Sequence, residues 1–137
     1  MRYSIYKMPE TEIFFFQDAD GHSPVVEWLE ELRRTDPKAL GNCLVVVERL
    51  RQDGHELRRP TADLLRDGIY ELRAKKQHVQ YRLLYFFHGR NVAILAHGLI
   101  KEDVVPPADI ERALRRKKLF EADPEAHKCR SERYGRL

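Results

Sequence analysis

The chain has 137 residues and a mass of 16.2 kDa, the size of one domain that can bury its own core. Hydrophobic residues make up 42% and charged residues 34%, which excludes a wholly disordered chain and predicts a densely charged surface. No apolar run approaches the roughly 20 residues of a membrane-spanning helix, and no signal-peptide pattern follows Met1. We therefore expect a cytoplasmic protein without a membrane partner. Cys43 and Cys129 lack the spacing of a disulfide or metal site and are expected to be free thiols.

The net charge is +3 and the pI about 8.9, but the basic residues are unevenly distributed. They gather in the middle and late parts of the chain, at Arg58, Arg59, Arg66, Arg73, Lys75, Lys76 and at Arg112, Arg115, Arg116, Lys117, Lys118. This distribution fits a nucleic acid or another polyanionic partner, and it also fits an ordinary solvated surface or an acidic partner chain. Charge by itself does not decide between them.

The first half of the chain predicts one strand and two helices. The aromatic run from Ile13 to Phe16, with Gly21 behind it, indicates a buried or edge strand followed by a turn. Ser23-Pro24 is typical of a helix start, and apolar residues follow at i, i+3, i+4 and i+7. Asp36-Pro37 repeats this signal, and the second apolar stripe stops at Asp53-Gly54, where glycine suits a helix end.

From residue 69 onward the pattern changes from helical to alternating. Segments 69–75, 79–88 and 92–101 alternate apolar and polar residues and are separated by short turns, which predicts an antiparallel meander. Pro106-Pro107 ends the sheet and opens a last helix with its basic residues outward. The predicted fold class is α+β: an antiparallel β-sheet with two N-terminal helices packed on one face and a C-terminal helix. The other face of the sheet is expected to be open.

The chain divides, on this prediction, into a domain over residues 1–120 and a charged C-terminal extension over residues 121–137. The extension is almost wholly polar and contains Pro124 and Gly135, so we expect it to be frayed. A lead of about ten residues precedes the first strand.

Basic side chains are predicted to gather on the open sheet face. An even-length turn between Ala74 and Val79 puts Arg73 and Arg82 on the same face as neighbours. With Gly89-Arg90 as a two-residue loop, His97 is expected opposite Arg82, and Lys101 further along that face. Glu71 belongs to the same face.

Such a patch suits metal-independent RNA cleavage, in which a ribose 2′-hydroxyl attacks the neighbouring phosphate. Arginine holds phosphate, histidine titrates near neutrality, and lysine supplies a point charge, so the candidate catalytic residues are Arg73, Arg82, His97 and Lys101. Because no metal-ligand spacing is present, we expect no metal and no cofactor. In the alternative interpretation these residues are solvated surface side chains and a hydrogen-bonded structural histidine.

Four stretches in series carry a resemblance to a known family. They are residues 21–29 (GHSPVVEWL), 65–73 (LRDGIYELR), 80–87 (QYRLLYFF) and 97–101 (HGLIK), followed by Pro107 and Ile110. In this order and spacing they resemble the RelE/ParE superfamily of type II toxins, in particular its HigB-like, phage-derived branch. The resemblance covers roughly residues 13 to 118.

The resemblance implies a RelE-like fold, cleavage of translated messenger RNA in the ribosomal A site, and neutralisation by a cognate antitoxin, commonly a helix-turn-helix protein encoded beside the toxin. By position, Arg73 and Arg82 match the phosphate-contacting arginines, and Lys101 matches the first lysine of the C-terminal basic motif. His97 matches the histidine of the His-Gly strand, to which no role is assigned. Further candidates for RNA contact are Lys75, Lys76, Arg115 and Arg116.

One departure from the family pattern keeps two functional hypotheses open. Where members often continue with a second lysine, a threonine and a further Lys-Thr-Pro, residues 102–106 are Glu-Asp-Val-Val-Pro. Each exposed carboxylate there would oppose RNA by about 0.5 to 1 kcal/mol. The leading hypothesis is a ribosome-dependent messenger-RNA endoribonuclease toxin. The alternative is a non-enzymatic binding protein, either a ParE-like gyrase inhibitor or a decayed toxin that only binds its antitoxin.

Overall fold

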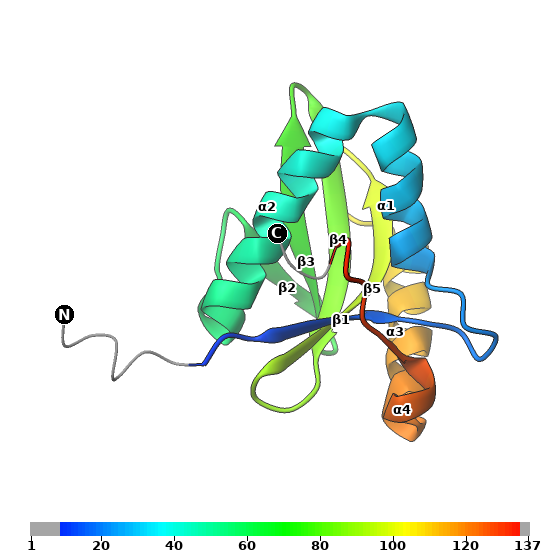
Figure 1. The fold of residues 1–137 in the computed structure, drawn as a ribbon. Helices are drawn as coiled ribbons and strands as arrows, with labels where there is room; N and C mark the ends of the chain where they lie inside the picture. Colours follow the sequence, from blue (N-terminus) through cyan, green and yellow to red (C-terminus); the bar gives the residue numbers. More distant parts are fainter. Residues whose placement is uncertain (1–8, 135–137) are drawn as a thin grey trace.

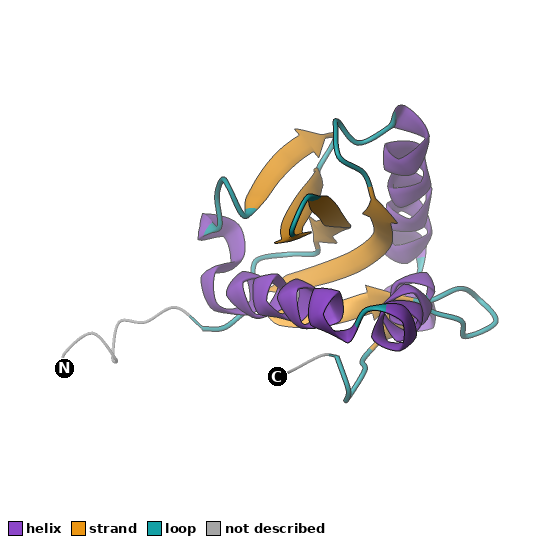
Figure 2. Cartoon of the chain, turned by 90° about the horizontal axis from the view of Figure 1, so that it is seen from above, coloured by secondary structure: helices purple, strands orange, loops and turns teal. Residues whose placement is uncertain are grey.

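The computed structural model describes residues 9–134, with a six-stranded sheet and helices on both sides of it (Figures 1 and 2). The strands are β1 (Glu12–Phe16), β2 (Ala62–Arg66), β3 (Ile69–Lys76), β4 (Val79–Phe87), β5 (Val92–Ile100) and β6 (Lys128–Cys129). The helices are α1 (Pro24–Thr35), α2 (Pro37–Asp53), α3 (Pro107–Ala122) and α4 (Pro124–His127), with a 3₁₀ turn η2 (Gly54–Glu56). The α+β class is confirmed, and the arrangement is consistent with a RelE-like fold. Within the described part of the chain, no helix is both long and apolar enough to cross a membrane.

The predicted helix ends are confirmed by their capping contacts. The Ser23 hydroxyl accepts a hydrogen bond from the backbone N–H of Val26 at 3.4 Å, and the Asp36 carboxylate accepts one from Ala39 at 3.2 Å. Gly54 ends α2 with φ of 52°, a left-handed conformation that glycine adopts without a steric penalty. These local signals fix where α1 and α2 begin and end.

The sheet has the order β2-β3-β4-β5-β1-β6. Strands β2 to β5 form an antiparallel meander, which the sequence predicted for β3 to β5. Strand β1 lies parallel to β5, with Ile13 beside Ala93 and Phe14 beside Ile94, so the sheet is mixed. A long excursion through α1, α2 and the meander separates β1 from β5 in the chain, and such a connection permits parallel pairing.

Both faces of the sheet are covered, so the expectation of an open face is wrong. Helices α1 and α2 cover one face over a core that includes Phe15 and Leu83. Helix α3 covers much of the other face, where Phe86 and Phe120 are fully buried with their ring centroids 5.6 Å apart. The open-face expectation failed because β1, β4 and β5 carry large apolar residues on both faces, which require cover on both.

Residues 121–134 are packed rather than frayed, which corrects the expectation for this part of the C-terminal extension. Helix α3 continues to Ala122, and β6 pairs antiparallel with the end of β1. The His127 ring stacks on Phe16 with centroids 5.2 Å apart, and Tyr134 is only 2% exposed. A few buried side chains therefore hold this segment against the fold, although most of its residues are polar. Residues 1–8 of the predicted lead and 135–137 of the predicted extension lie outside the described residues.

Candidate functional site

Arg73 and Arg82 lie side by side on the α3 face of the sheet, and both bind the carboxylate of Glu71. The two arginines are direct partners in the β3–β4 register, as the turn length predicted. Arg82 Nη1 donates to Glu71 Oε1 at 2.8 Å, whereas Arg73 donates from Nε and Nη2 to Glu71 Oε2 at 3.0 and 2.8 Å. Only 2% of the Glu71 side chain is exposed. The candidate site is therefore built around a buried carboxylate that two guanidinium groups share.

Arg82 connects β4 to the segment that follows β5. Its Nε donates to the backbone oxygen of Lys101 at 3.1 Å, and its Nη2 donates to that of Glu102 at 3.4 Å. With Glu71 bound at Nη1, each nitrogen of this guanidinium has an acceptor. Because, in addition, only 8% of the side chain is exposed, these contacts favour a positioning role for Arg82 over direct contact with a phosphate.

Arg73 is the more accessible of the two arginines. One third of its side chain (33%) is exposed, and its Nη1 takes no part in the bonds to Glu71. Asp63 of β2 lies 3.7 Å from Arg73 Nη2 and 2.8 Å from Arg59 Nη2. These side chains and Asp103 help to line a pocket of about 570 Å³. Because carboxylates alternate with arginines around it, the pocket carries little excess positive charge.

Sequence reasoning missed Asp63 and Arg59 because it did not predict β2. Residues 62–66 show no clear alternation, and β2 is a short edge strand. A usable signal was nevertheless present in Asp67-Gly68, a dipeptide typical of two-residue hairpin turns. Both residues have positive φ, 52° and 81°, and they join β2 to β3. That turn would have predicted a strand that ends at Arg66, directly before Asp67.

His97 lies opposite Leu84 rather than opposite Arg82, so the predicted pairing is wrong. Leu99 takes the position beside Arg82, because the β4–β5 register shifts between Leu84 and Tyr85. A bulge of this kind adds one residue to one strand and displaces every later partner. His97 keeps the predicted sheet face but moves away from Arg82 along β5.

The His97 ring is held between β5 and α3. Its Nε2 lies 2.7 Å from Asp109 Oδ1, and its Nδ1 lies 3.3 Å from Arg116 Nη1. Since a guanidinium only donates, Nδ1 accepts and Nε2 donates to Asp109, which describes the neutral ring. Burial lowers the pKa of His97; the hydrogen bond to Asp109 opposes this shift, and Arg116 adds to it. Both ring nitrogens are thus engaged in fastening α3 to the sheet.

The predicted lysines have different surroundings. Lys101 is exposed directly after β5, and its backbone is held by Arg82. Lys75 is exposed near the β3–β4 turn. Lys76 lies on the other sheet face, where its Nζ donates to both carboxylate oxygens of Asp36 at 2.9 and 2.8 Å. Lys101 and Lys75 are accessible to a ligand, whereas Lys76 is engaged at the start of α2.

The predicted arginines of α3 are not part of the pocket around Arg73. Arg115 is exposed, and Arg116 is half-buried with its guanidinium 5.9 Å from the centre of the Phe16 ring. Both line a separate hollow between α3 and β1. The predicted arginines therefore lie in two separate places on the α3 side of the sheet, and Lys76 lies on the other face.

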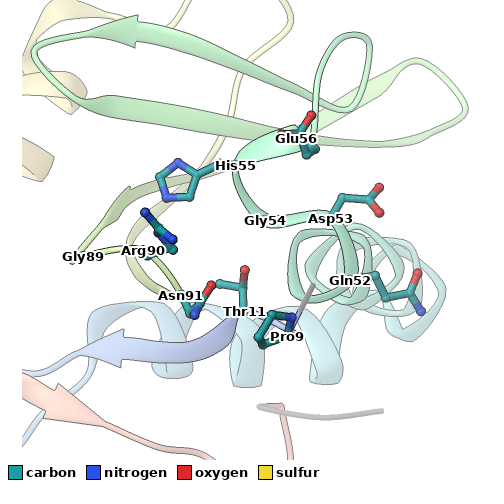
Figure 3. Close-up of a pocket in the computed structure, with 10 residues that line it drawn as sticks. All are labelled: Pro9, Thr11, Gln52, Asp53, Gly54, His55, Glu56, Gly89, Arg90 and Asn91. Atoms are coloured by element: carbon teal, nitrogen blue, oxygen red, sulfur yellow. The ribbon is translucent and has the colours of Figure 1, made fainter. Parts of the chain in front are cut away.

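A further pocket of about 580 Å³ lies where α2, η2 and the β4–β5 turn meet (Figure 3). Its lining includes Asp53 and Glu56 from the end of α2 and from η2, and Arg90 and Asn91 from the turn. None of the predicted site residues lines it. Two carboxylates beside one arginine make this pocket a poor site for a polyanion.

Comparison with known proteins places the chain in a family. A search of curated proteins found no match. Residues 30–118 match the family described as phage-derived protein Gp49-like, and this span covers well over half of the chain, including Arg73, Arg82, His97 and Lys101. The chain therefore belongs to the phage-derived Gp49-like family of toxin-like, RelE/HigB-type proteins.

Proposed function

We propose that this chain is the toxin of a type II toxin-antitoxin system and acts in the cytoplasm as a ribosome-dependent messenger-RNA endoribonuclease. Membership of a toxin-like family supports the assignment of this chain as a toxin, and it implies that a cognate antitoxin exists. The HigB-like resemblance supports the finer points: messenger RNA on the ribosome as the substrate, and a helix-turn-helix protein as the antitoxin.

The observation that carries the proposal is the geometry of Arg73. Glu71 holds the guanidinium through Nε and Nη2, and the side chain is one-third (33%) exposed beside the pocket. The remaining Nη1 is therefore held in place to meet a phosphate oxygen, with little side-chain freedom left to lose. The exposed Lys101 is the second candidate cation, and Arg82 positions it through the Lys101 backbone oxygen.

The reaction that we propose needs no metal. The 2′-oxygen of one nucleotide forms a bond to the adjacent phosphorus, the bond from phosphorus to the 5′-oxygen breaks, and a 2′,3′-cyclic phosphate results. A proton leaves the 2′-hydroxyl and one is delivered to the 5′-oxygen. Arg73 and Lys101 would stabilise the negative charge that develops on the phosphoryl oxygens. His97 stays a candidate acid or base by residue type, although its contacts with Asp109 and Arg116 favour a structural role.

A non-enzymatic binding protein is the second candidate, and the charge balance of the pocket favours it. Glu71 and Asp63 already neutralise Arg73 and Arg82 within the chain, and Asp103 lines the same pocket. A ParE-like gyrase inhibitor or a decayed toxin that only binds its antitoxin would not need an excess of cations there.

Induced expression in bacterial cells separates these functions. Wild type is compared with Arg73→Gln and with Arg33→Gln, a control that removes an exposed, ion-paired arginine from α1 on the other face of the sheet. Growth is followed, and the 5′ ends of a reporter message are mapped with and without its start codon. Thermal melting of the purified variants shows that each is folded.

We expect growth arrest with cuts inside the translated reporter, both lost in Arg73→Gln and kept in Arg33→Gln. The reporter without a start codon should stay intact, because cleavage depends on translation. Arrest without cuts would contradict the nuclease and support another target such as gyrase. Absence of arrest, with folded wild-type protein present, would support the decayed toxin.

A further inference from the structure

A second basic region lies in a hollow between α3 and the end of β1. The hollow measures about 390 Å³ and is lined by Phe16, Asp18, Arg112, Arg115, Arg116, Lys118 and Leu119. It shares no lining residue with the pocket around Arg73. Four of its residues are cations, and Asp18 supplies the opposing carboxylate.

The positive charge of this hollow is poorly balanced by the rest of the chain. Among residues 9–134, Arg115 and Lys118 have no carboxylate within 4.0 Å, and Arg112 reaches only Asp109, at 3.8 Å. Asp109 is itself 2.7 Å from His97. Elsewhere in the described part of the chain most arginines lie within 4.0 Å of a carboxylate, including Arg73. Like charges gathered without counter-charges repel one another, and an anion in the hollow would relieve that repulsion.

The other flank of α3 shows the contrast. There Glu111 lies 2.6 Å from Arg66, and Glu121 lies 3.6 Å from Lys117. The opposite charges of that flank are matched within the chain. Arg115 and Lys118 lie between this flank and the hollow and help to line both, whereas Arg112 and Arg116 belong to the hollow, so the unmatched cations of α3 lie toward β1.

Arg116 gives the hollow a rigid inner wall. Its Nη1 donates to the backbone oxygen of Ala96 at 2.7 Å, and its guanidinium carbon lies 5.9 Å from the centre of the fully buried Phe16 ring. Burial lowers the pKa of this arginine; Asp18 opposes the shift, whereas Arg112 and Arg115 add to it. The side chain is thus ordered before any ligand arrives, and only the exposed cations need to adjust.

The composition of the hollow favours RNA over an acidic protein segment. Protein interfaces have an apolar core, and Leu119, at 51% exposure, is the exposed apolar side chain that this hollow offers. Nucleic-acid interfaces are more polar and more positively charged, and arginine forks match phosphate oxygens. The hollow also lies on the same side of the sheet as Arg73.

We infer that the hollow between α3 and β1 is a phosphate-binding site for an RNA strand. The side chains that contact the phosphates are Arg112, Arg115, Arg116 and Lys118. Such a site anchors RNA apart from the arginine pair that binds Glu71. It deepens the proposed function, on which the identity of RNA as the substrate rests.

The test measures binding with a probe that the protein cannot cleave. A fluorescein-labelled 12-nucleotide RNA with 2′-O-methyl groups is titrated with wild type, with an Arg115→Gln, Lys118→Gln variant, and with an Arg33→Gln, Arg34→Gln control. Each double variant removes two exposed cations, so both change the net charge equally. Fluorescence anisotropy is recorded over a series of salt concentrations, and an octaglutamate peptide of similar charge serves as the acidic competitor.

We expect the α3 variant to bind the RNA about tenfold more weakly, with the slope of log affinity against log salt reduced by about 1.4, since two phosphate contacts are lost. The α1 control should bind like wild type. Equal affinity of the α3 variant and wild type, or an equal loss in both double variants, would overturn the site. Competition by octaglutamate at the same concentration as unlabelled RNA would overturn RNA as its ligand.

The experiments distinguish failure of the nuclease proposal from failure of the phosphate-site proposal. If the wild type cuts no translated message while the Arg115→Gln, Lys118→Gln variant alone binds RNA more weakly, the phosphate site stands without the nuclease. If the message is cut and the affinity is unchanged, the nuclease stands without this site.

Discussion

Arg82 donates a hydrogen bond from Nη1 to Glu71 Oε1 at 2.8 Å, and the two side chains are only 8% and 2% exposed. Removing either partner of such a buried ion pair destabilises the fold, because the remaining charge stays in surroundings that solvate it poorly. The buried ion pair gives Arg82 a different role from its neighbour Arg73, although the sequence predicted the same role for both. Arg82 belongs to the interior of the fold, and Arg73 to its accessible surface.

Substitution of the two arginines should therefore have different consequences for stability. We expect Arg82→Ala to lower the free energy of unfolding by about 3 kcal/mol, since Glu71 loses its buried partner and the Lys101 carbonyl loses a donor. Arg73→Ala should cost about 1 kcal/mol or less, because its side chain is one-third (33%) exposed. Urea denaturation of both variants checks the ranking, and equal losses would contradict the distinction.

Stability should depend on pH through His97. Its folded-state pKa lies below the ordinary value of 6.5, chiefly because of burial, so the unfolded chain takes up the proton first. The contribution of this group is fully present above about pH 6.5 and is lost as pH falls through the folded-state pKa. Urea midpoints between pH 8 and 5 should fall more steeply for wild type than for His97→Gln. The exposed turn variant His78→Gln should follow wild type, and identical profiles for all three proteins would refute this role.

Gly98 is expected to tolerate no side chain. A Cβ atom at this position would lie 2.5 Å from Cδ2 of Trp28, whose ring packs from α1 onto β5. We expect Gly98→Ala to destabilise the protein by about 1 to 3 kcal/mol through overpacking. Gly41→Ala, where a Cβ meets nothing within 4 Å, is the matched control in α2 and should leave the thermal midpoint unchanged or higher. A neutral Gly98→Ala would show that Trp28 moves aside readily.

Removing charge from Glu102 and Asp103 should strengthen RNA binding at the pocket around Arg73. Both residues are exposed, and Asp103 lines that pocket. Each carboxylate opposes RNA by about 0.5 to 1 kcal/mol. The double variant Glu102→Gln, Asp103→Asn should therefore raise the affinity for the 2′-O-methyl RNA by roughly 5- to 30-fold. Glu30→Gln, Glu31→Gln in α1 provides the matched change in net charge. An equal gain in both variants would assign the effect to overall charge instead.

Local signals predicted the parts of the fold that depend on neighbouring residues. The caps at Ser23 and Asp36 and the hairpin register of Arg73 with Arg82 follow from short-range rules, and they agree with the structure. The parallel pairing of β1 with β5 could not be predicted in this way, because the two strands are far apart in the sequence. The packed C-terminal segment escaped notice for a related reason, since Tyr134 finds its buried position only in the folded molecule.

The candidate site was predictable only in part: Glu71, Arg73 and Arg82 could be placed on one face, but Asp63 and the resulting balance of charge could not. Alternation placed Glu71 on the face of Arg73 and Arg82, and this was the available signal that the arginines are partly neutralised. The extra residue in β5 displaced His97, and bulges leave no reliable mark in a single sequence. Asp109 and Arg116 reach His97 from α3, a contact between separate elements that periodicity does not reveal.

The most direct test of the central proposal uses purified components. A messenger RNA is incubated with the wild-type protein or Arg73→Gln, either free in solution or held on translating ribosomes, and its cleavage sites are mapped. We expect cuts in the ribosome-bound message at the codon in the A site, none in free RNA, and a large loss of cleavage for Arg73→Gln. Intact ribosome-bound message with folded wild-type protein, or undiminished cleavage by Arg73→Gln, would contradict the proposal.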